Sequence, residues 1–228
     1  MRRTLIIGAT SAIAAQVARL CAARSEALYL LGRDEEKLAA LTRSLGAAVR
    51  GSATADFTET AGNAARIDEA VRALGGLDSV IIAHGDLGDQ LESERSYEHA
   101  EHLFSVNLLS VVSFLVPAAN LLEAAGPRAG HERASILVLS SVAGDRGRPR
   151  NYTYGAAKAA LNVYLMGLRS RLYGSGARVV AIRLGPVDTP MTDTHDKNVL
   201  FARAEDVARA IVTARDEGPQ DVYVPWFW

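Results

Sequence analysis

Ser141, Tyr154 and Lys158 are side chains that can move a proton, and they lie close together in the sequence. Residues 135–139, Ser-Ile-Leu-Val-Leu, have the apolar pattern of a buried strand that would end near Ser141. Tyr154 and Lys158 stand four residues apart in a predicted helix, so their side chains share one face. An ammonium group beside a phenol is expected to lower the phenol pKa from its usual value of about 10. This pattern predicts a tyrosine that exchanges a proton with an alcohol or carbonyl oxygen.

The three residues are informative only if predicted elements bring them together, because Tyr-x-x-x-Lys occurs by chance in many helices. Short apolar runs alternate with longer amphipathic segments along the chain. The predicted strands are Leu5–Gly8, Ala27–Leu31, Ala47–Arg50, Ser79–Ala83, Ile136–Leu139, Val179–Leu184 and Val222–Val224. The predicted helices lie near residues 12–24, 34–45, 59–74, 94–125, 152–174 and 205–216. This alternation predicts one α/β domain over residues 1–228, a doubly wound Rossmann-type parallel sheet of about seven strands with helices on both faces.

The composition restricts the class of protein. Of the 228 residues 49% are hydrophobic and 22% are charged, which is typical of a globular chain. A net charge of −1 gives no basic surface for nucleic acid. The one cysteine, Cys21, excludes an intramolecular disulfide, and the first residues enter a strand pattern without a signal peptide. We therefore expect a cytoplasmic protein with no transmembrane segment and no nucleic-acid partner.

Ligands of such sheets bind outside the carboxyl ends of the strands, so the residues after each strand are the candidate site. Gly8-Ala9-Thr10-Ser11-Ala12-Ile13-Ala14 follows the first strand, where backbone N–H groups and a helix start can approach a pyrophosphate. The second strand is followed by Gly32-Arg33-Asp34. Arg33 suits the 2′-phosphate of NADP, and Asp34 is explained as a helix N-cap. We predict NADP(H), with NAD(H) as the alternative cofactor and a solvated charge as the alternative role of Arg33.

With these residues together, the chain resembles the short-chain dehydrogenase/reductase family over essentially its whole length. Gly8-x-x-x-Ala12-x-Ala14 resembles the Gly-x-x-x-Gly-x-Gly cofactor turn of the family, and Asp56 resembles its adenine-contacting aspartate. Ala83-His84-Gly85 occupies the Asn-Ala-Gly position. Leu184-Gly185-Pro186-Val187-Asp188-Thr189 is similar to the Pro-Gly segment that holds the nicotinamide, with the two residues in reversed order. The residues that match the catalytic tetrad are Asn107, Ser141, Tyr154 and Lys158.

The resemblance implies an NAD(P)-dependent oxidoreductase that transfers hydride between nicotinamide and a carbonyl or secondary alcohol. It implies that Tyr154 is the acid or base, that Lys158 lowers its pKa and binds the nicotinamide ribose, and that Ser141 stabilises negative charge on the substrate oxygen. Asn107 would interrupt a helix and hold a water leading to Lys158; by itself it would be an ordinary helix asparagine. The implied cofactor contacts are Gly8, Thr10, Ser11, Ala12, Ile13, Arg33, Asp56, Phe57, Ala83, His84, Gly85, Tyr154, Lys158, Pro186, Val187 and Thr189.

The chain departs from the family pattern at several positions. Ala12 and Ala14 add methyl groups at the cofactor turn, which affects the strength of binding rather than its occurrence. We expect His84 to be a hydrogen-bonded structural histidine, with a second proton-transfer role as the alternative. His99 and His102 stand three residues apart, which can be a metal-ligand spacing, but an exposed helix face is the better interpretation and no metal is required.

Two segments next to the predicted pocket bear on the substrate. The loop from Val142 to Asn151 carries three arginines, which either bind a phosphate or carboxylate or are simply solvated. Thr189–Arg203 is short and polar for a substrate lid, which favours an open or polar site.

The aromatic residues of Trp226-Phe227-Trp228 allow three interpretations. We expect them to pack at a subunit interface; the alternatives are the wall of an apolar substrate pocket and a membrane surface. This ending weakly resembles that of the branch that reduces a keto-sugar on a polyprenyl phosphate carrier. A phosphorylated or lipid-linked sugar is therefore a candidate substrate.

Two predicted helices have more apolar surface than a sheet alone can cover. Residues 108–125 are apolar around most of the helix, and residues 156–168 are rich in small side chains. Because the family commonly pairs these helices across a two-fold axis, we expect a homodimer or homotetramer. The competing function is a catalytically idle dinucleotide-binding or sensing module of the same fold. The longer epimerase and dehydratase relatives carry a further substrate domain, for which this length leaves no room.

Overall fold

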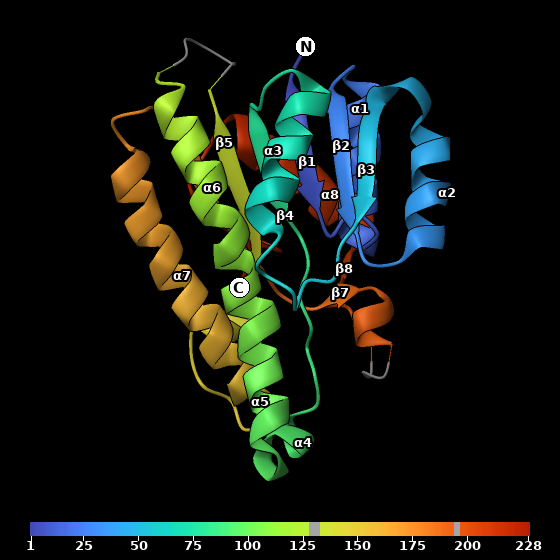
Figure 1. The fold of residues 1–228 in the computed structure, drawn as a ribbon. Coiled ribbons are helices and arrows are strands. Elements are labelled where there is room, and N and C mark those ends of the chain that lie inside the picture. Colours follow the sequence, from blue (N-terminus) through green and yellow to red (C-terminus); the bar gives the residue numbers. More distant parts are fainter. Residues whose placement is uncertain (128–132, 194–196) are drawn as a thin grey trace.

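The computed structural model describes residues 1–127, 133–193 and 197–228. Within them a seven-stranded sheet has the order β3-β2-β1-β4-β5-β6-β9, and all neighbouring strands are parallel (Figure 1). The strands are β1 (Arg3–Ile7), β2 (Ala27–Gly32), β3 (Val49–Thr54), β4 (Ser79–Ile82), β5 (Ser135–Ser141), β6 (Arg178–Leu184) and β9 (Asp221–Val224). The chain winds outward from β1 to β3 and returns beside β1 with β4, so the predicted doubly wound Rossmann-type fold is confirmed.

Helices cover both faces of the sheet, because consecutive strand residues point to opposite sides. Leu5 and Ile7 belong to one hydrophobic cluster, which the front helices of Figure 1 complete, whereas Ile6 belongs to a second cluster behind the sheet. The front helices are α3 (Asn63–Leu74), α6 (Ser110–Ala124) and α7 (Tyr152–Leu172), and those behind are α1 (Ala12–Ala23), α2 (Glu35–Leu45) and α8 (Ala204–Asp216). Both faces of the central strands are dry, which explains their continuous apolar sequences.

The edge strand β3 differs from the sequence prediction. The predicted strand Ala47–Arg50 overlaps only the start of β3, which runs on through the small residues Gly51–Thr54. Its side chains alternate between half-buried and exposed, because an edge strand has one protected face. The second half of β3, made of small residues, therefore lacks the run of large apolar side chains that identifies the central strands.

The helix predicted over residues 94–125 is divided at Ser96 and interrupted in its regular winding by a π-helical turn. Ser96 has extended backbone and separates α4 (Gln90–Arg95) from α5 (Tyr97–Phe104), and its side chain caps α5 by accepting from the N–H of His99. A π-helical turn, Ser105–Leu109, then joins α5 to α6. The continuous stretch Tyr97–Ala124 has a window long and apolar enough to cross a membrane, with a mean hydropathy of 1.7. Half of that window is buried, and the helix packs on the sheet as a core element.

A small parallel ribbon extends the fold beyond β6. β7 (Val187–Asp188) pairs with β8 (Ala202–Arg203) beside the carboxyl edge of the main sheet (Figure 1). The segment between them holds a short 3₁₀ turn, Pro190–Thr192. Residues 194–196 of the expected lid segment lie outside the described residues.

Candidate functional site

The turn after β1 is so tight that only glycine fits at residue 8. Gly8 has a φ of +79°, and a Cβ there would lie 2.5 Å from the backbone N of His84. The N–H groups of Gly8 and Ala9 both donate to the carbonyl of Leu31, at 2.9 and 2.8 Å. Ser11 then caps α1, since its side chain accepts from the N–H of Ala14. The bare backbone and the open helix start form a cradle of the kind that suits a pyrophosphate.

Arg33 and Asp34 take different roles after β2. Asp34 caps α2 by accepting from the N–H of Lys37 at 2.9 Å, and its second oxygen pairs with the Lys37 ammonium at 3.0 Å. Arg33 is exposed and forms no ion pair with the described residues. The pKa of Asp56 is lowered mainly by hydrogen bonds from Thr58, and that of His84 mainly by burial. The positive charge of Arg33 makes a smaller contribution to both. The prediction that Asp34 is an N-cap is confirmed, and Arg33 stays available for a ligand.

Asp56 and Phe57 follow β3 and differ in what they can offer a cofactor. The Asp56 carboxylate accepts from the N–H and the hydroxyl of Thr58, both at 2.8 Å, and these bonds are the main reason that its pKa is lowered. One carboxylate oxygen remains open at the surface. Phe57 is 3% exposed and its ring lies in the core, so its side chain offers no contact at the surface.

His84 is a core residue of the loop after β4. Its Nε2 lies 3.0 Å from the hydroxyl of Ser110, and its ring stacks on Phe57 with the centroids 4.2 Å apart. Burial lowers the pKa of His84 to about 3, with smaller contributions from the charges of Lys158 and Arg33. A histidine that is neutral at physiological pH and held in this way is structural, and its geometry gives no support to a second proton-transfer role.

Asn107 lies in the π turn between α5 and α6 and is fully buried. Its Oδ1 accepts from the N–H of Asp86 at 3.1 Å, and its Nδ2 donates to the carbonyl oxygens of Asp86 at 2.7 Å and Leu103 at 2.9 Å. The helix interruption expected at Asn107 is therefore present. Both polar ends of the side chain clamp the loop after Gly85. Asp86, which sequence reasoning missed, is the partner of this clamp.

Strand β5 and helix α7 bring Ser141, Tyr154 and Lys158 together. Ser141 is the last residue of β5, and Tyr154 and Lys158 lie on the first turns of α7. Two buried bonds fix this helix against the strand: Lys158 Nζ donates to Leu139 O at 3.2 Å, and Ser140 Oγ donates to Asn162 Oδ1 at 2.6 Å. Lys158 Nζ also lies 5.6 Å from the centre of the Tyr154 ring. The predicted juxtaposition of the three side chains is confirmed.

The expectation that the pKa of Tyr154 is lowered is wrong. Burial raises the pKa of Tyr154 to about 12, because the phenolate is desolvated, while a side-chain hydrogen bond with Ser141 acts in the opposite direction. Burial also lowers the pKa of Lys158 to about 8. Tyr154 is therefore a protonated phenol at neutral pH, as a proton donor must be.

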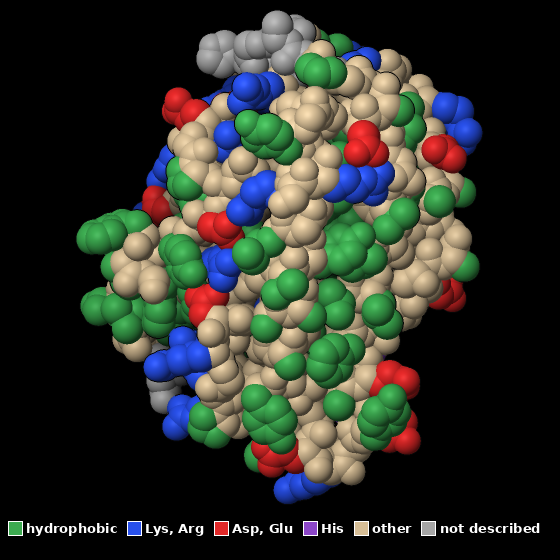
Figure 2. All heavy atoms as spheres, turned by 90° about the vertical axis from the view of Figure 1, so that its left-hand side faces the viewer, with side chains coloured by type: hydrophobic (Ala, Val, Ile, Leu, Met, Phe, Trp, Pro, Cys, Tyr) green, Lys and Arg blue, Asp and Glu red, His purple; other side chains and the backbone are tan. Residues whose placement is uncertain are grey.

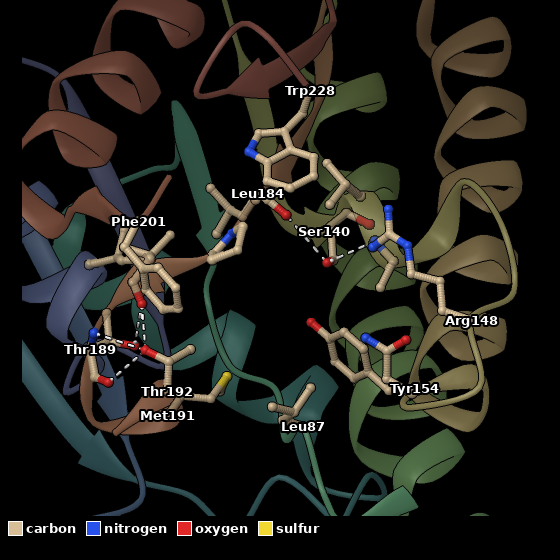
Figure 3. A pocket seen from close by; sticks show the side chains of 18 residues that line it. Leu87, Ser140, Arg148, Tyr154, Leu184, Thr189, Met191, Thr192, Phe201 and Trp228 are labelled. Atoms are coloured by element: carbon tan, nitrogen blue, oxygen red, sulfur yellow. Dashed lines mark hydrogen bonds between the residues drawn. The ribbon is translucent and has the colours of Figure 1, made fainter. Parts of the chain in front are cut away.

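A cavity of ≈ 210 Å³ opens between these catalytic-type residues and the segment after β6 (Figure 3). The Tyr154 hydroxyl points into it, and Thr189, Met191 and Phe201 lie across the cavity from Tyr154. Its other described lining residues are Ile13, Leu87, Ser140, Ser141, Val142, Ala143, Arg148, Asn151, Leu184, Gly185, Pro186, Val187, Thr192 and Trp228. Six predicted site residues thus line one cavity: Ile13, Ser141, Tyr154, Pro186, Val187 and Thr189.

The structure selects among the candidate substrate residues. Of the three loop arginines only Arg148 lines the cavity, whereas Arg146 and Arg150 are exposed away from it. Trp228 also lines the cavity, which supports the pocket-wall alternative for this residue over our first expectation of an interface. Trp226 does not line it and is 85% exposed. The cavity walls are mainly apolar, so of the two expectations, an open or a polar site, the polar one is disfavoured.

The two histidines with metal-like spacing have other contacts. His102 Nε2 lies 3.2 Å from Asp86 Oδ2, and His99 Nε2 accepts from the N–H of Asp89 at 3.3 Å. Within the described ranges no group of three or more His, Cys, Asp or Glu side chains gathers as metal ligands.

Comparisons with known proteins agree with this geometry. A family model described as short chain dehydrogenase matches residues 2–199. An uncharacterized oxidoreductase of Mycobacterium tuberculosis is 33% identical over 225 residues, which cover 97% of this chain and 88% of the relative. An uncharacterized oxidoreductase of Streptomyces coelicolor is 34% identical over 228 residues, which cover 98% and 87%. The crystal structure of a short chain dehydrogenase from Burkholderia cenocepacia in complex with NADP matches with a TM-score of 0.81 at 20% identity, covering 98% of this chain and 89% of that one.

The chain therefore belongs to the short-chain dehydrogenase/reductase family. It is an NAD(P)-dependent oxidoreductase of that family. At 20% identity the likeness to the Burkholderia structure shows the fold alone.

Proposed function

We propose that the protein is an NADPH-dependent reductase of a carbonyl compound, with Tyr154 as the proton donor. The observation that carries this proposal is the convergence of Ser141 and Tyr154 on the cavity that Pro186 and Val187 also line. A phenol that is protonated at neutral pH can serve as the proton donor that reduction requires.

Each residue has a distinct part in this proposal. A nicotinamide dinucleotide, when bound, supplies the hydride that the carbonyl carbon receives. Tyr154 donates its phenol proton to the carbonyl oxygen, and the positive charge of Lys158 stabilises the phenolate that remains. Ser141 donates a hydrogen bond to the same oxygen as negative charge develops on it. Its present bond to Leu184 O is long, at 3.3 Å, so this hydroxyl is free to turn toward a substrate.

The preference for NADPH rests on the edge beside β2. Asp34 is committed to capping α2, and Arg33 forms no ion pair with the described residues. A guanidinium that is planar and free matches a 2′-phosphate, whereas an acid at this place would favour a ribose hydroxyl. The remaining predicted contacts follow the edge from Gly8 to Gly85 and would hold the pyrophosphate, ribose and adenine.

We also propose that the protein is a cytoplasmic homodimer or homotetramer that acts as one dinucleotide-binding domain over residues 1–228. Figure 2 shows hydrophobic side chains spread along the face formed by α6 and α7, with few charges in its centre. Large apolar side chains on this face are exposed: Leu109 by 56%, Val163 by 69% and Met166 by 54%. A surface of this kind is typical of a subunit contact. Sedimentation as a monomer at micromolar concentration would contradict this assembly.

Two measurements test the proposed function. The first is a fluorescence titration with NADPH and NADH, in which we expect tighter binding of NADPH. The second follows the absorbance of NADPH against aromatic, aliphatic and phosphorylated-sugar carbonyl compounds. Consumption of NADPH that depends on the carbonyl compound supports a reductase, whereas tight cofactor binding with no turnover of any compound would favour the idle-module alternative.

A further inference from the structure

The cavity has one charged side chain among its described lining residues, Arg148. Arg148 is partly buried and forms no ion pair with the residues that the structure describes. The nearby Arg183 differs, because it pairs with Asp145 and, at 2.9 Å, with Asp221. Among the described residues, therefore, no neighbouring carboxylate neutralises the charge of Arg148. A half-buried guanidinium left in this way is suited to an anion that arrives with the substrate.

The end of the cavity at Trp228 is apolar, in contrast to the charged side chain of Arg148. A Cβ at Gly185 would lie 2.1 Å from Nε1 of Trp228, so the indole rests on bare backbone just after β6. This contact fixes the ring while 40% of the residue remains exposed. In Figure 3 the indole and Leu87 lie at opposite ends of the cavity, with Phe201 along its side. Exposed apolar rings in a cavity are covered when a flat apolar ligand enters.

We infer that the substrate is an acidic carbonyl compound with a flat apolar body, an inference that rests on the proposed function. Arg148 holds the carboxylate or phosphate of this substrate, and the indole of Trp228 packs against its body. The carbonyl oxygen then lies at Tyr154 and Ser141, which line the same cavity. A small keto acid such as pyruvate satisfies Arg148 but leaves Trp228 uncovered, and a neutral ketone leaves Arg148 without a partner.

Three probes separate the two contacts: 4-acetylbenzoate, its neutral methyl ester, and pyruvate, each with NADPH. We expect kcat/KM to be about tenfold to a hundredfold higher for 4-acetylbenzoate than for the ester, because an arginine–carboxylate contact is charge-assisted. Arg148→Gln should remove this preference without changing the affinity for NADPH. Arg150→Gln is the matched control, since Arg150 lies in the same loop but does not line the cavity, and it should keep the preference.

The aromatic wall has its own pair of variants. Trp228→Ala should lower kcat/KM for both aromatic ketones about tenfold, because the ring contact is lost. Trp226→Ala should leave both values unchanged, since Trp226 does not line the cavity. A change in sedimenting mass with unchanged kcat/KM in Trp228→Ala would assign the ring to a subunit interface and overturn its role in the pocket.

Two readouts with the same ketones, turnover and binding by isothermal titration calorimetry, distinguish failure of the anionic-substrate inference from failure of the proposed reductase function. If the ester and the acid are turned over equally fast, and Tyr154→Phe abolishes both activities, the protein is a reductase but the inference of an anionic substrate is overturned. Weaker NADPH binding by Arg148→Gln overturns it too, because the arginine would then hold the cofactor. If no ketone is turned over, tighter binding of the acid that Arg148→Gln removes still supports the anion site, and equal binding of acid and ester overturns it.

Discussion

The cavity joins two regions that the fold controls to different degrees. At its inner wall, Ser141 and Tyr154 are held by the end of β5 and the start of α7, and buried Lys158 is tied to the strand through Leu139 O. At its outer wall, Arg148 lies on the loop before α7, and Trp228 lies beyond β9. Regular elements fix the groups that would move the proton, whereas irregular segments supply those that would meet the rest of the substrate. Such a division allows the substrate to differ among proteins that share one chemistry.

The largest difference between the two walls is expected when Lys158 of the inner wall and Arg148 of the outer wall are each replaced by an uncharged residue. Lys158→Met should lower turnover about a hundredfold to ten thousandfold, because the phenolate of Tyr154 loses its cation. The same change should raise the free energy of unfolding at pH 7, since burial lowers the pKa of Lys158 from its ordinary value of 10.5 to about 8. That shift corresponds to a cost of about 3 kcal/mol for the charged form, offset by the lost hydrogen bond to Leu139.

The pH dependence gives the sign of this effect. The unfolded chain keeps the Lys158 proton up to about pH 10.5, whereas the folded protein releases it near pH 8. The penalty is therefore full below pH 8 and is relieved between pH 8 and 10.5. Urea unfolding should show that this rise in stability is present in the wild type and absent in Lys158→Met. Arg148→Met is the control at the outer wall, and its unfolding free energy should change by less than about 0.5 kcal/mol. Equal changes in the free energy of unfolding in Lys158→Met and Arg148→Met would contradict the proposed difference between the inner and outer walls.

A second, smaller contrast concerns cofactor choice. Arg33→Ser should weaken NADPH binding about tenfold to a hundredfold and leave NADH binding unchanged, because the charged contact to the 2′-phosphate is lost. Turnover at saturating NADPH should stay close to that of the wild type. Lys37→Ser is the control, since Lys37 is also an exposed cation at the start of α2 but pairs with Asp34. Equal weakening of NADPH and NADH by Arg33→Ser would assign a general electrostatic role to Arg33.

The smallest effect is on stability alone, at His84. Burial lowers the pKa of His84 in the folded protein to about 3 from its ordinary value of 6.5, so the unfolded chain takes up a proton first as the pH falls. The stability contributed by neutral His84 is full above pH 6.5 and is lost toward pH 3. Between pH 7 and 5 the wild type should lose about 2 kcal/mol more than His84→Asn, measured by urea unfolding. His102→Gln, a change at an exposed histidine, should keep the wild-type slope; an identical slope in His84→Asn would show that His84 is not responsible.

Sequence patterns predicted the inner wall well because they report local geometry. The carboxyl ends of parallel strands meet at one edge, and a spacing of four residues places Tyr154 and Lys158 on one helix face. Asn107 was also placed at a helix interruption, through the family resemblance. The identity of its partner, Asp86, could not be predicted, because the loop after β4 meets the π turn only in the folded chain.

The outer wall was harder to predict for a physical reason. Arg146, Arg148 and Arg150 are alike in sequence, and only the path of the loop decides which one faces the cavity. Trp228 reaches the cavity because Gly185, far away in sequence, leaves room for the indole. The raised pKa of Tyr154 was missed for a related reason, since spacing reports the neighbouring cation but not the extent of burial.

The direct test of the central claim is the turnover of Tyr154→Phe, measured with NADPH and the best carbonyl compound found for the wild type. This change removes the phenol hydroxyl that points into the cavity and keeps the ring that packs beside Lys158. We predict that turnover falls at least about a thousandfold while NADPH affinity, measured by fluorescence, stays within about twofold. Turnover within about tenfold of the wild type, with NADPH still bound, would show that Tyr154 is not the proton donor and would contradict the account.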